Sequence, residues 1–230
     1  MQIPRLHVTA ALAPGVIVPG TEAQAHYLAS VLRRAPESEL TLFNGRDGEW
    51  RAAYRPERRT AAFRVLSQRR PQSPEPDLWL LFAPLKRDAT DLLAEKATEL
   101  GVSRLLPTIT ARTIAARVNT DRLRAIAIEA AEQSERLTVP EIEAPRPLAE
   151  RLATWPQDRI LTVAAERRTA PPPGAHSGAL LIGPEGGWTS PELDLLERYP
   201  FVTWASLGPR ILRAETAAIA GLALLLAAGP

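Results

Sequence analysis

Two segments near the C-terminal end most constrain the fold, because each joins an apolar run to a glycine- and proline-containing loop and then to a helix start. The apolar run 179–183 leads into GPEGGWTSPE at residues 183–192. The run 201–207 leads into LGPRILRAETA at residues 207–217. Such loops form at the carboxyl ends of parallel strands, where α/β proteins hold ligands. If the two strands are neighbours in the sheet, their loops form one ligand-binding crevice.

Strand and helix patterns alternate through residues 78–230, which predicts a largely parallel sheet covered by helices. Residues 78–85 are apolar on both faces, as a buried parallel strand is, and Pro107 places the next strand, 103–109, near an edge. The other expected strands are 160–165, 179–183 and 201–207. The expected helices are 88–100 with Gly101 as its stop, 121–137, 191 to about 198, and 212 to about 227. The third of them begins either with Ser190 as N-cap or with a capping box from Thr189 to Glu192.

The N-terminal residues are expected to form a small β-barrel, an architecture often used to bind RNA. The strand-like runs are 5–10, 16–18, 40–44, 49–54 and 61–66, with a glycine-rich hairpin signal at 44–48. One helix is expected from Thr21, as N-cap, to about Arg33. Residues 68–77 hold three prolines and no aliphatic residue, which predicts a semi-rigid linker. The predicted domains are therefore 1–70 and 78–230, joined by a linker at 71–77.

The sequence contains no cysteine, which excludes disulfides, thiolate metal sites and a cysteine nucleophile. The three histidines, His7, His26 and His176, have no partners at metal-ligand spacing, so we expect no metal. The longest apolar run is 12 residues, which is too short to span a bilayer. The first residues lack the apolar region of a signal peptide. These features predict a cytoplasmic protein that does not enter the membrane.

The basic residues comprise 26 arginines and only 2 lysines. Arginine binds phosphates through a planar fork of donors and stacks on bases, so this favours RNA binding, although a general compositional bias would give the same count. Residues 1–76 carry 11 basic against 7 acidic residues, and residues 77–230 carry 17 against 19. A basic N-terminal part therefore indicates an RNA-binding module attached to a catalytic one. Arg33 and Arg34 either complement the dipole of the first helix or meet phosphates.

The two C-terminal loops carry side chains that suggest a ligand. Glu185 would repel a phosphate, and no lysine follows it as in a P-loop, so the first loop suits a neutral or cationic ligand. In the second loop, Ile211 and Leu212 either sandwich a flat heterocycle or pack against the last helix. Arg210 and Arg213 are placed to face a polyanionic partner.

Together, GPEGGWTSPE and LGPRILRAETA resemble the signature pair of the bacterial 16S ribosomal RNA (uracil-N3) methyltransferases, the small-subunit methyltransferase E family of the SPOUT superfamily. EAAEQSER at residues 129–136, HYLASVLR at 26–33 and LFNG at 42–45 match further segments of that family. The resemblance implies a PUA-like β-barrel followed by an α/β domain with a deep trefoil knot. It also implies a homodimer that uses S-adenosylmethionine and acts on 16S ribosomal RNA of the small subunit.

The resemblance places cofactor-binding and catalytic residues on the loops described above. The implied cofactor-binding residues are Ala164, Ala165, Glu166, Ile182, Gly183, Pro184, Glu185, Gly186, Leu207, Gly208, Ile211, Leu212, Arg213, Thr216 and Ala217. We expect direct methyl transfer to a uridine N3, with Arg213 or Arg210 stabilising the uracil anion and Glu185 as a candidate base. The expected RNA contacts are Arg5, Arg33, Arg34, Arg87, Arg112 and Arg136.

Two alternatives remain open at the level of sequence. A SPOUT methyltransferase could act on transfer RNA or on a ribose 2′-hydroxyl, and Arg87 keeps the ribose reaction open. A non-catalytic RNA-binding assembly factor could retain the fold without the cofactor. The intact glycines of both loops argue against this second alternative, since a lost site has no reason to keep them.

Overall fold

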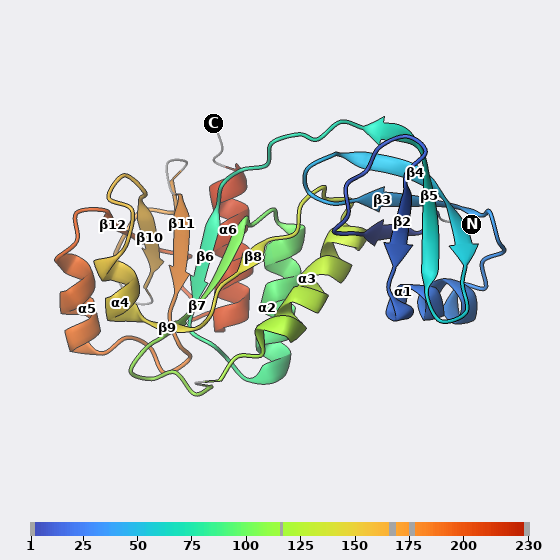
Figure 1. Ribbon diagram of the computed structural model, residues 1–230. Helices are drawn as coiled ribbons and strands as arrows, with labels where there is room; N and C mark the ends of the chain where they lie inside the picture. Colours follow the sequence, from blue (N-terminus) through green and yellow to red (C-terminus); the bar gives the residue numbers. More distant parts are fainter. Residues whose placement is uncertain (1–2, 116, 166–168, 175–177, 228–230) are drawn as a thin grey trace. The chain divides into compact units, whose positions relative to one another are not determined.

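The computed structural model describes residues 3–115, 117–165, 169–174 and 178–227 (Figure 1). The chain divides into two compact units, one of Met1–Glu75 with Ala131–Val139 and one of Pro76–Ala130 with Pro140–Pro230. Residues 131–139 thus belong to the same unit as the N-terminal residues. The predicted division into 1–70, 71–77 and 78–230 follows the chain order and does not include this segment in its first domain. That division stays a prediction. In the described residues, no helix has the length and apolar character needed to cross a membrane.

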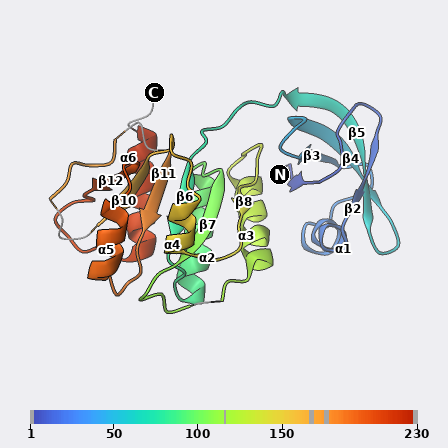
Figure 2. The same ribbon diagram turned by 60° about the vertical axis from the view of Figure 1, so that its left-hand side comes forward.

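The first unit contains a five-stranded sheet in the order β1-β3-β4-β5-β2, which confirms the expected PUA-like, barrel-type module (Figure 2). β1 runs parallel to β3, and the other pairs are antiparallel. The strands curl around a core that includes Leu6, Val18, Leu42 and Phe63. The strand bounds are Arg5–His7, Ile17–Gly20, Glu39–Phe43, Glu49–Pro56 and Ala61–Arg70 for β1 to β5.

The helix of this unit begins as predicted but continues differently. Thr21 is its N-cap in a capping box with Gln24, whose backbone N–H donates to the Thr21 hydroxyl at 3.1 Å. The α-helix α1 spans only Glu22–His26, and a π-helical turn, Tyr27–Val31, replaces the expected α-helical continuation to Arg33. Arg33 then has a φ of 50°, which ends the helical path. The predicted single α-helix from 22 to 33 is therefore wrong beyond His26.

The expected linker begins later than the sequence suggests. Strand β5 continues to Arg70, and Gln68 and Arg70 pair with Trp50 and Glu49 of β4. Residues 68–70 contain no proline, so their backbone donors are free to extend the ladder. The linker prediction was wrong for these three residues, and Pro71 is the first residue whose ring prevents such pairing.

The second unit is built on a parallel sheet in the order β12-β10-β11-β6-β7-β8, with β9 pairing to β7 (Figure 1). All of its strand pairs are parallel, as the β/α alternation predicts. The strands β6 to β12 span Trp79–Phe82, Arg104–Ile109, Glu141–Ile142, Arg146–Pro147, Leu161–Ala164, Ala179–Ile182 and Val202–Ala205. The helices α2 to α6 span Arg87–Glu99, Thr120–Gln133, Leu148–Ala153, Ser190–Glu197 and Ala214–Ala227.

Alternate strand residues of this sheet face two different layers of helices. Leu81 and Leu181 belong to one core cluster with residues of α4 and α5, including Leu152 and Leu196. The intervening residue Leu180 faces α6, where a Cβ on Gly221 would lie 2.7 Å from the Leu180 side chain. A glycine at this position therefore lets α6 lie directly on β11. Both faces of the sheet are covered, which explains why its strands read as continuous apolar runs.

Several local predictions can be compared with this unit. Gly101 has a φ of 86° directly after the α2 C-cap, as expected of a helix stop. Thr189 is the N-cap of α5 with Glu192 completing the capping box, so the alternative frame was correct. Helix α3 ends at Gln133 rather than near 137, because Glu135 takes a left-handed φ of 60°. The two-residue strands β8 and β9 and helix α4 were not predicted.

Candidate functional site

A pocket of about 300 Å³ opens at the carboxyl ends of three parallel strands of the second unit. Ala164 at the end of β10 lies in register with Ile182 of β11 and with Ala205 of β12. Because the strands are parallel, the loops that follow them emerge at one edge of the sheet. Those loops form the walls of the pocket, and the first turn of α6 completes it.

The sequence suggested that the strands carrying the two signature loops are neighbours in the sheet. In the structure they are not. β10 lies between β11 and β12 and pairs with both. The crevice is consequently wider than a gap between adjacent strands, and Ala164 and Ala165 after β10 provide a third wall. The prediction of directly adjacent strands was wrong, because chain order does not specify strand order in a parallel sheet.

Most of the expected cofactor-binding residues line this pocket. Gly186 and Thr216 do not line it, and Glu166 lies outside the described residues. Sequence reasoning missed three lining residues, Gly187, Trp188 and Ala214, although all three lie within the quoted motifs. The expected cofactor-binding residues that line the pocket are Ala164, Ala165, Ile182, Gly183, Pro184, Glu185, Leu207, Gly208, Ile211, Leu212, Arg213 and Ala217. Arg210, which we expected as a catalytic residue, lines it as well.

The loop after β11 is shaped by close packing between its own residues. A Cβ on Gly183 would lie 2.7–2.9 Å from atoms of the Trp188 indole, so the absence of a side chain at 183 lets the indole lie against the backbone. The Gly187 N–H donates to the Pro184 carbonyl at 2.9 Å, and Gly187 takes a φ of 71°. The carboxylate of Glu185 is left exposed at the pocket.

The loop after β12 contributes a glycine turn, apolar side chains and two cations. Gly208 has a φ of 108°, a conformation that residues with a Cβ strongly resist. Ile211 lines the pocket while 61% of its surface is exposed, so its side chain is accessible to a ligand. Arg210 and Arg213 also line the pocket and are exposed, so their guanidinium groups are available to a negatively charged reactant.

A turn after β7 contacts the loop after β11. The exposed side chain of Arg112 donates from Nη1 to the Gly186 carbonyl at 2.6 Å. The backbone N–H of Ala111 donates to Oε1 of Glu192 at 2.7 Å. The structure therefore gives Arg112 a contact with the pocket loop, while its contact with RNA stays a prediction.

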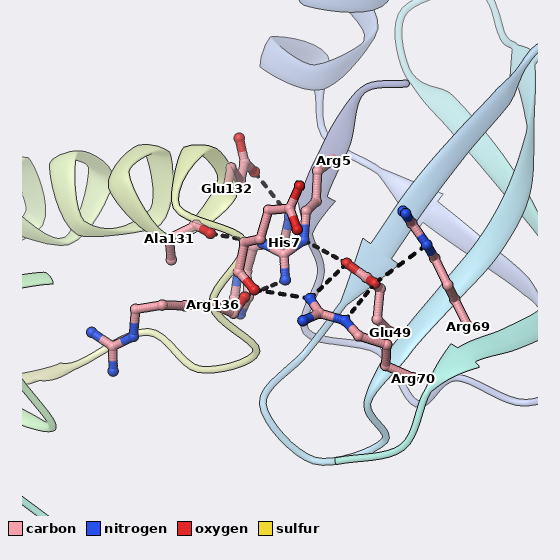
Figure 3. A network of polar contacts seen from close by, with 9 residues as sticks. Arg5, His7, Glu49, Arg69, Arg70, Ala131, Glu132 and Arg136 are labelled. Atoms are coloured by element: carbon pink, nitrogen blue, oxygen red, sulfur yellow. Dashed lines mark hydrogen bonds and ion pairs between the residues drawn. The ribbon is translucent and has the colours of Figure 1, made fainter. Parts of the chain in front are cut away.

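Two other arginines that we expected to contact RNA, Arg5 and Arg136, have buried side chains in the first unit, and Figure 3 shows the polar contacts around Arg5. Arg5 is 8% exposed, donates to Glu49 and to the carbonyls of Ala131 and Arg136, and lies 3.8 Å from the centre of the Phe43 ring. The Arg136 side chain is 7% exposed and donates from Nε to Glu75 at 2.9 Å. Neither guanidinium faces solvent, so we do not carry these two residues forward as phosphate contacts.

The remaining expected RNA contacts have different surroundings. Arg33 and Arg87 are exposed, and Arg34 is half-buried. Several other N-terminal arginines form ion pairs, so part of the basic excess is neutralised within the unit. These pairs join Arg51 to Glu39, Arg55 and Arg64 to Glu37, and Arg69 and Arg70 to Glu49.

Family models match both parts of the chain. A model described as an RNA methyltransferase domain matches residues 71–226, and one described as an RNA methyltransferase PUA domain matches residues 21–65. Among curated proteins, ribosomal RNA small subunit methyltransferase E of Rickettsia conorii is 34% identical, over 97% of this chain and 95% of its own. The protein of the same name from Synechocystis is 33% identical, over 88% of this chain and 70% of its own.

Solved structures show the same architecture over the whole chain. A ribosomal RNA small subunit methyltransferase E from Neisseria gonorrhoeae, bound to S-adenosyl methionine, superposes with a TM-score of 0.90 at 28% identity. That match covers 99% of this chain and 98% of the other. A methyltransferase from Legionella pneumophila in complex with the same cofactor gives a TM-score of 0.86 at 29% identity, covering 100% and 99% of the two chains.

Proposed function

The chain belongs to the ribosomal RNA small subunit methyltransferase E family, and from this membership we propose that it methylates N3 of a specific uridine in 16S ribosomal RNA. S-adenosylmethionine is the methyl donor, as in the solved relatives. The observation that carries the proposal is the pocket formed by the loops after β10, β11 and β12. It combines apolar walls, a carboxylate and two exposed arginines in one place.

The lining of the pocket fits the proposed donor. Ile182, Leu207 and Leu212 are apolar and suit the faces of an adenine ring. Glu185 is exposed at the pocket, where its carboxylate complements the positive sulfonium. The left-handed Gly208 lets the backbone come close to a ligand, because no Cβ stands between them.

The proposed reaction is a direct displacement. When bound, the donor supplies a methyl group on a positively charged sulfur, which needs no further activation. Uracil N3 must lose its proton as it gains the methyl group, so the protein has to stabilise negative charge on the ring. Arg213 or Arg210 provides that stabilisation, and Glu185 is the proposed acceptor of the proton. The loops hold the reacting atoms in line.

The first unit is proposed to hold the RNA substrate, either as 16S ribosomal RNA or within the small ribosomal subunit. Arg33 of this unit is exposed and can bind phosphates, and Arg34 lies beside it. Arg87, on α2 of the second unit, is also exposed and is proposed as a further phosphate contact. Their binding should weaken as the salt concentration rises, because each phosphate contact releases counterions. The uridine itself is expected to be presented unstacked from a single-stranded region.

We also propose that the protein is a homodimer with a trefoil knot and acts in the cytoplasm, where its ribosomal substrate is found. Helix α6 supports the dimer, because its sequence AETAAIAGLALLLA is apolar nearly all round. Ala218 and Leu222 are buried, whereas Leu224 on another face is 40% exposed. A second copy of the chain would cover this exposed apolar face.

The first test measures donor binding by calorimetry with S-adenosylmethionine. Ile211→Asp should abolish binding without changing the melting temperature, because the side chain is 61% exposed. Ile114→Asp is the matched control, since Ile114 is 63% exposed and does not line the pocket. Loss of binding only in Ile211→Asp supports the assigned pocket, and equal binding by both variants overturns it.

The second test identifies the product. Unmethylated small subunits and free 16S ribosomal RNA are incubated with the protein and labelled donor, and the modified nucleoside is identified by mass spectrometry. N3-methyluridine is the expected product. A ribose-methylated product, or transfer to transfer RNA alone, would overturn the proposed substrate while leaving the donor site intact.

A further inference from the structure

We propose that Arg112 is a positioning residue that holds residues 183–189, here called the donor loop, in the shape that binds the methyl donor. This inference rests on the proposed function, because it takes S-adenosylmethionine as the ligand of the pocket. Arg112 does not itself line the pocket. It lies in the turn after β7 and acts on the donor loop through the Gly186 backbone.

The turn that carries Arg112 is internally braced. The Thr113 hydroxyl accepts a hydrogen bond from the Thr110 N–H at 2.8 Å and lies 2.9 Å from the Thr110 hydroxyl. The Thr113 N–H also donates to the Thr110 carbonyl at 3.1 Å. Three hydrogen bonds within four residues fix the backbone from which Arg112 projects.

Arg112 makes two kinds of contact with Gly186. Its Nη1 donates to the Gly186 carbonyl at 2.6 Å, a charge-assisted bond. Its aliphatic stem lies against the same residue, because a Cβ on Gly186 would be 3.3 Å from both Cβ and Cδ of Arg112. The middle of the donor loop is therefore held by a hydrogen bond and by packing at one point.

The end of the donor loop is tied to the same turn by Glu192. One carboxylate oxygen accepts from the Ala111 N–H at 2.7 Å, and the other accepts from the Thr189 N–H at 2.9 Å and its hydroxyl at 2.8 Å. This carboxylate thus joins the turn to the N-cap of α5. Arg112 and Glu192 fix two successive points of the same loop.

The residues between these two points explain why the contact matters for the ligand. Gly187 and Trp188 line the pocket, as does Glu185 just before Gly186. A loop with adjacent glycines loses much conformational freedom when it becomes ordered around a ligand. Anchoring Gly186 in advance removes part of that entropy cost, so the anchor should raise the affinity for the donor.

Arg112→Ala tests the proposal by calorimetric titration with S-adenosylmethionine. We expect the Kd to rise roughly 3- to 10-fold, which corresponds to the loss of one partly exposed charge-assisted bond. The melting temperature without donor should not change, because the side chain is exposed. Arg124→Ala, which removes an exposed arginine of α3 outside the pocket, is the matched control and should leave the Kd unchanged.

A double-mutant cycle with Gly186→Ala separates a local contact from a general effect. The added Cβ presses on the Arg112 stem, so Gly186→Ala should weaken donor binding on its own. The two changes together should cost less than the sum of their separate effects, because they disturb one contact. Strict additivity would contradict the proposed anchor.

The competing role for Arg112 is a phosphate contact. In that case Arg112→Ala would leave the donor Kd unchanged and weaken RNA binding with a shallower salt dependence, which overturns the positioning role. Failure of the unaltered protein to bind S-adenosylmethionine would instead overturn the proposed function itself. The two failures are therefore distinguishable in the same titrations.

Discussion

The guanidinium of Arg5 donates to the carboxylate of Glu49 at 2.8 Å, and the two side chains are only 8% and 2% exposed (Figure 3). The same guanidinium donates to the carbonyls of Ala131, at 2.7 Å, and of Arg136. Arg5 therefore joins β1 to a segment more than a hundred residues away in the sequence. These bonds to backbone carbonyls, together with the packing of Phe43 against Ala131 and Leu137, explain why residues 131–139 belong to the first compact unit.

Replacing Glu49 by alanine should strongly destabilise the protein. Glu49 accepts from Arg5 and from Arg70 at 2.8 Å, and its removal leaves the buried Arg5 charge without its partner. Breaking a buried ion pair on one side costs about 3 kcal/mol or more in the free energy of unfolding. Urea unfolding checks this. Arg51→Ala, which breaks an exposed pair with Glu39, is the control and should change the midpoint little.

Glu49 should also make stability depend on pH on the acid side. Burial raises the pKa of Glu49, but the hydrogen bonds from Arg70 and then Arg5 outweigh burial, so its pKa falls below the ordinary 4.5. A carboxyl with a lowered pKa in the folded state stabilises the protein above its ordinary pKa. That stability is lost as the pH falls through 4.5 toward the folded-state pKa.

Comparing the urea midpoint of the wild-type protein with that of Glu49→Gln, from about pH 6 to about pH 3, isolates this contribution. The variant should be less stable at pH 6, and the difference should shrink as the pH falls. A difference that stays constant across this range would contradict the assignment. A residual slope in both proteins is expected from other carboxyls whose pKa is lowered, namely Glu37, Glu39, Asp47 and Asp77.

Gly183→Ala should weaken donor binding by displacing Trp188. The added Cβ would lie 2.7 Å from the indole, so the ring must move away from the wall of the pocket. Titration with S-adenosylmethionine, followed by tryptophan fluorescence, measures both changes. In the background Trp188→Ala the same substitution should have a smaller effect, because the indole is gone. Gly174→Ala is the control, since a Cβ there meets no atom within 4 Å.

Arg213→Ala should lower the rate of methyl transfer far more than it lowers donor affinity. The proposed role of Arg213 is to stabilise charge that develops on the uracil during the reaction. Loss of one such group typically costs roughly 100- to 1,000-fold in kcat. Steady-state assays over a range of RNA concentrations, together with single-turnover assays at saturating RNA and donor, measure this step. An unchanged kcat with a raised KM for RNA would reassign Arg213 to binding, and the same assay on Arg210→Ala decides between the two arginines.

Local patterns predicted the elements whose signals lie within a few residues. The Thr21 capping box, the left-handed Gly101 after α2 and the apolar strand at Trp79–Phe82 all follow from short-range chemistry. The π-helical turn at Tyr27–Val31 did not, because five residues are too few to give a periodicity that distinguishes a π-helix from an α-helix. The two-residue strands β8 and β9 are too short to produce any periodicity.

The sequence by itself determined the alternation of strands and helices and the two glycine loops, because these depend on neighbours along the chain. Its resemblance to a known family indicated most of the residues that line the pocket. Only the tertiary structure decided that β10 separates β11 from β12 and that Arg5 is buried against Glu49. It alone also brought Arg112 to Gly186, 74 positions away. The sequence does not show whether an arginine side chain will contact solvent, a carboxylate or a backbone carbonyl. Its partner is decided by long-range packing.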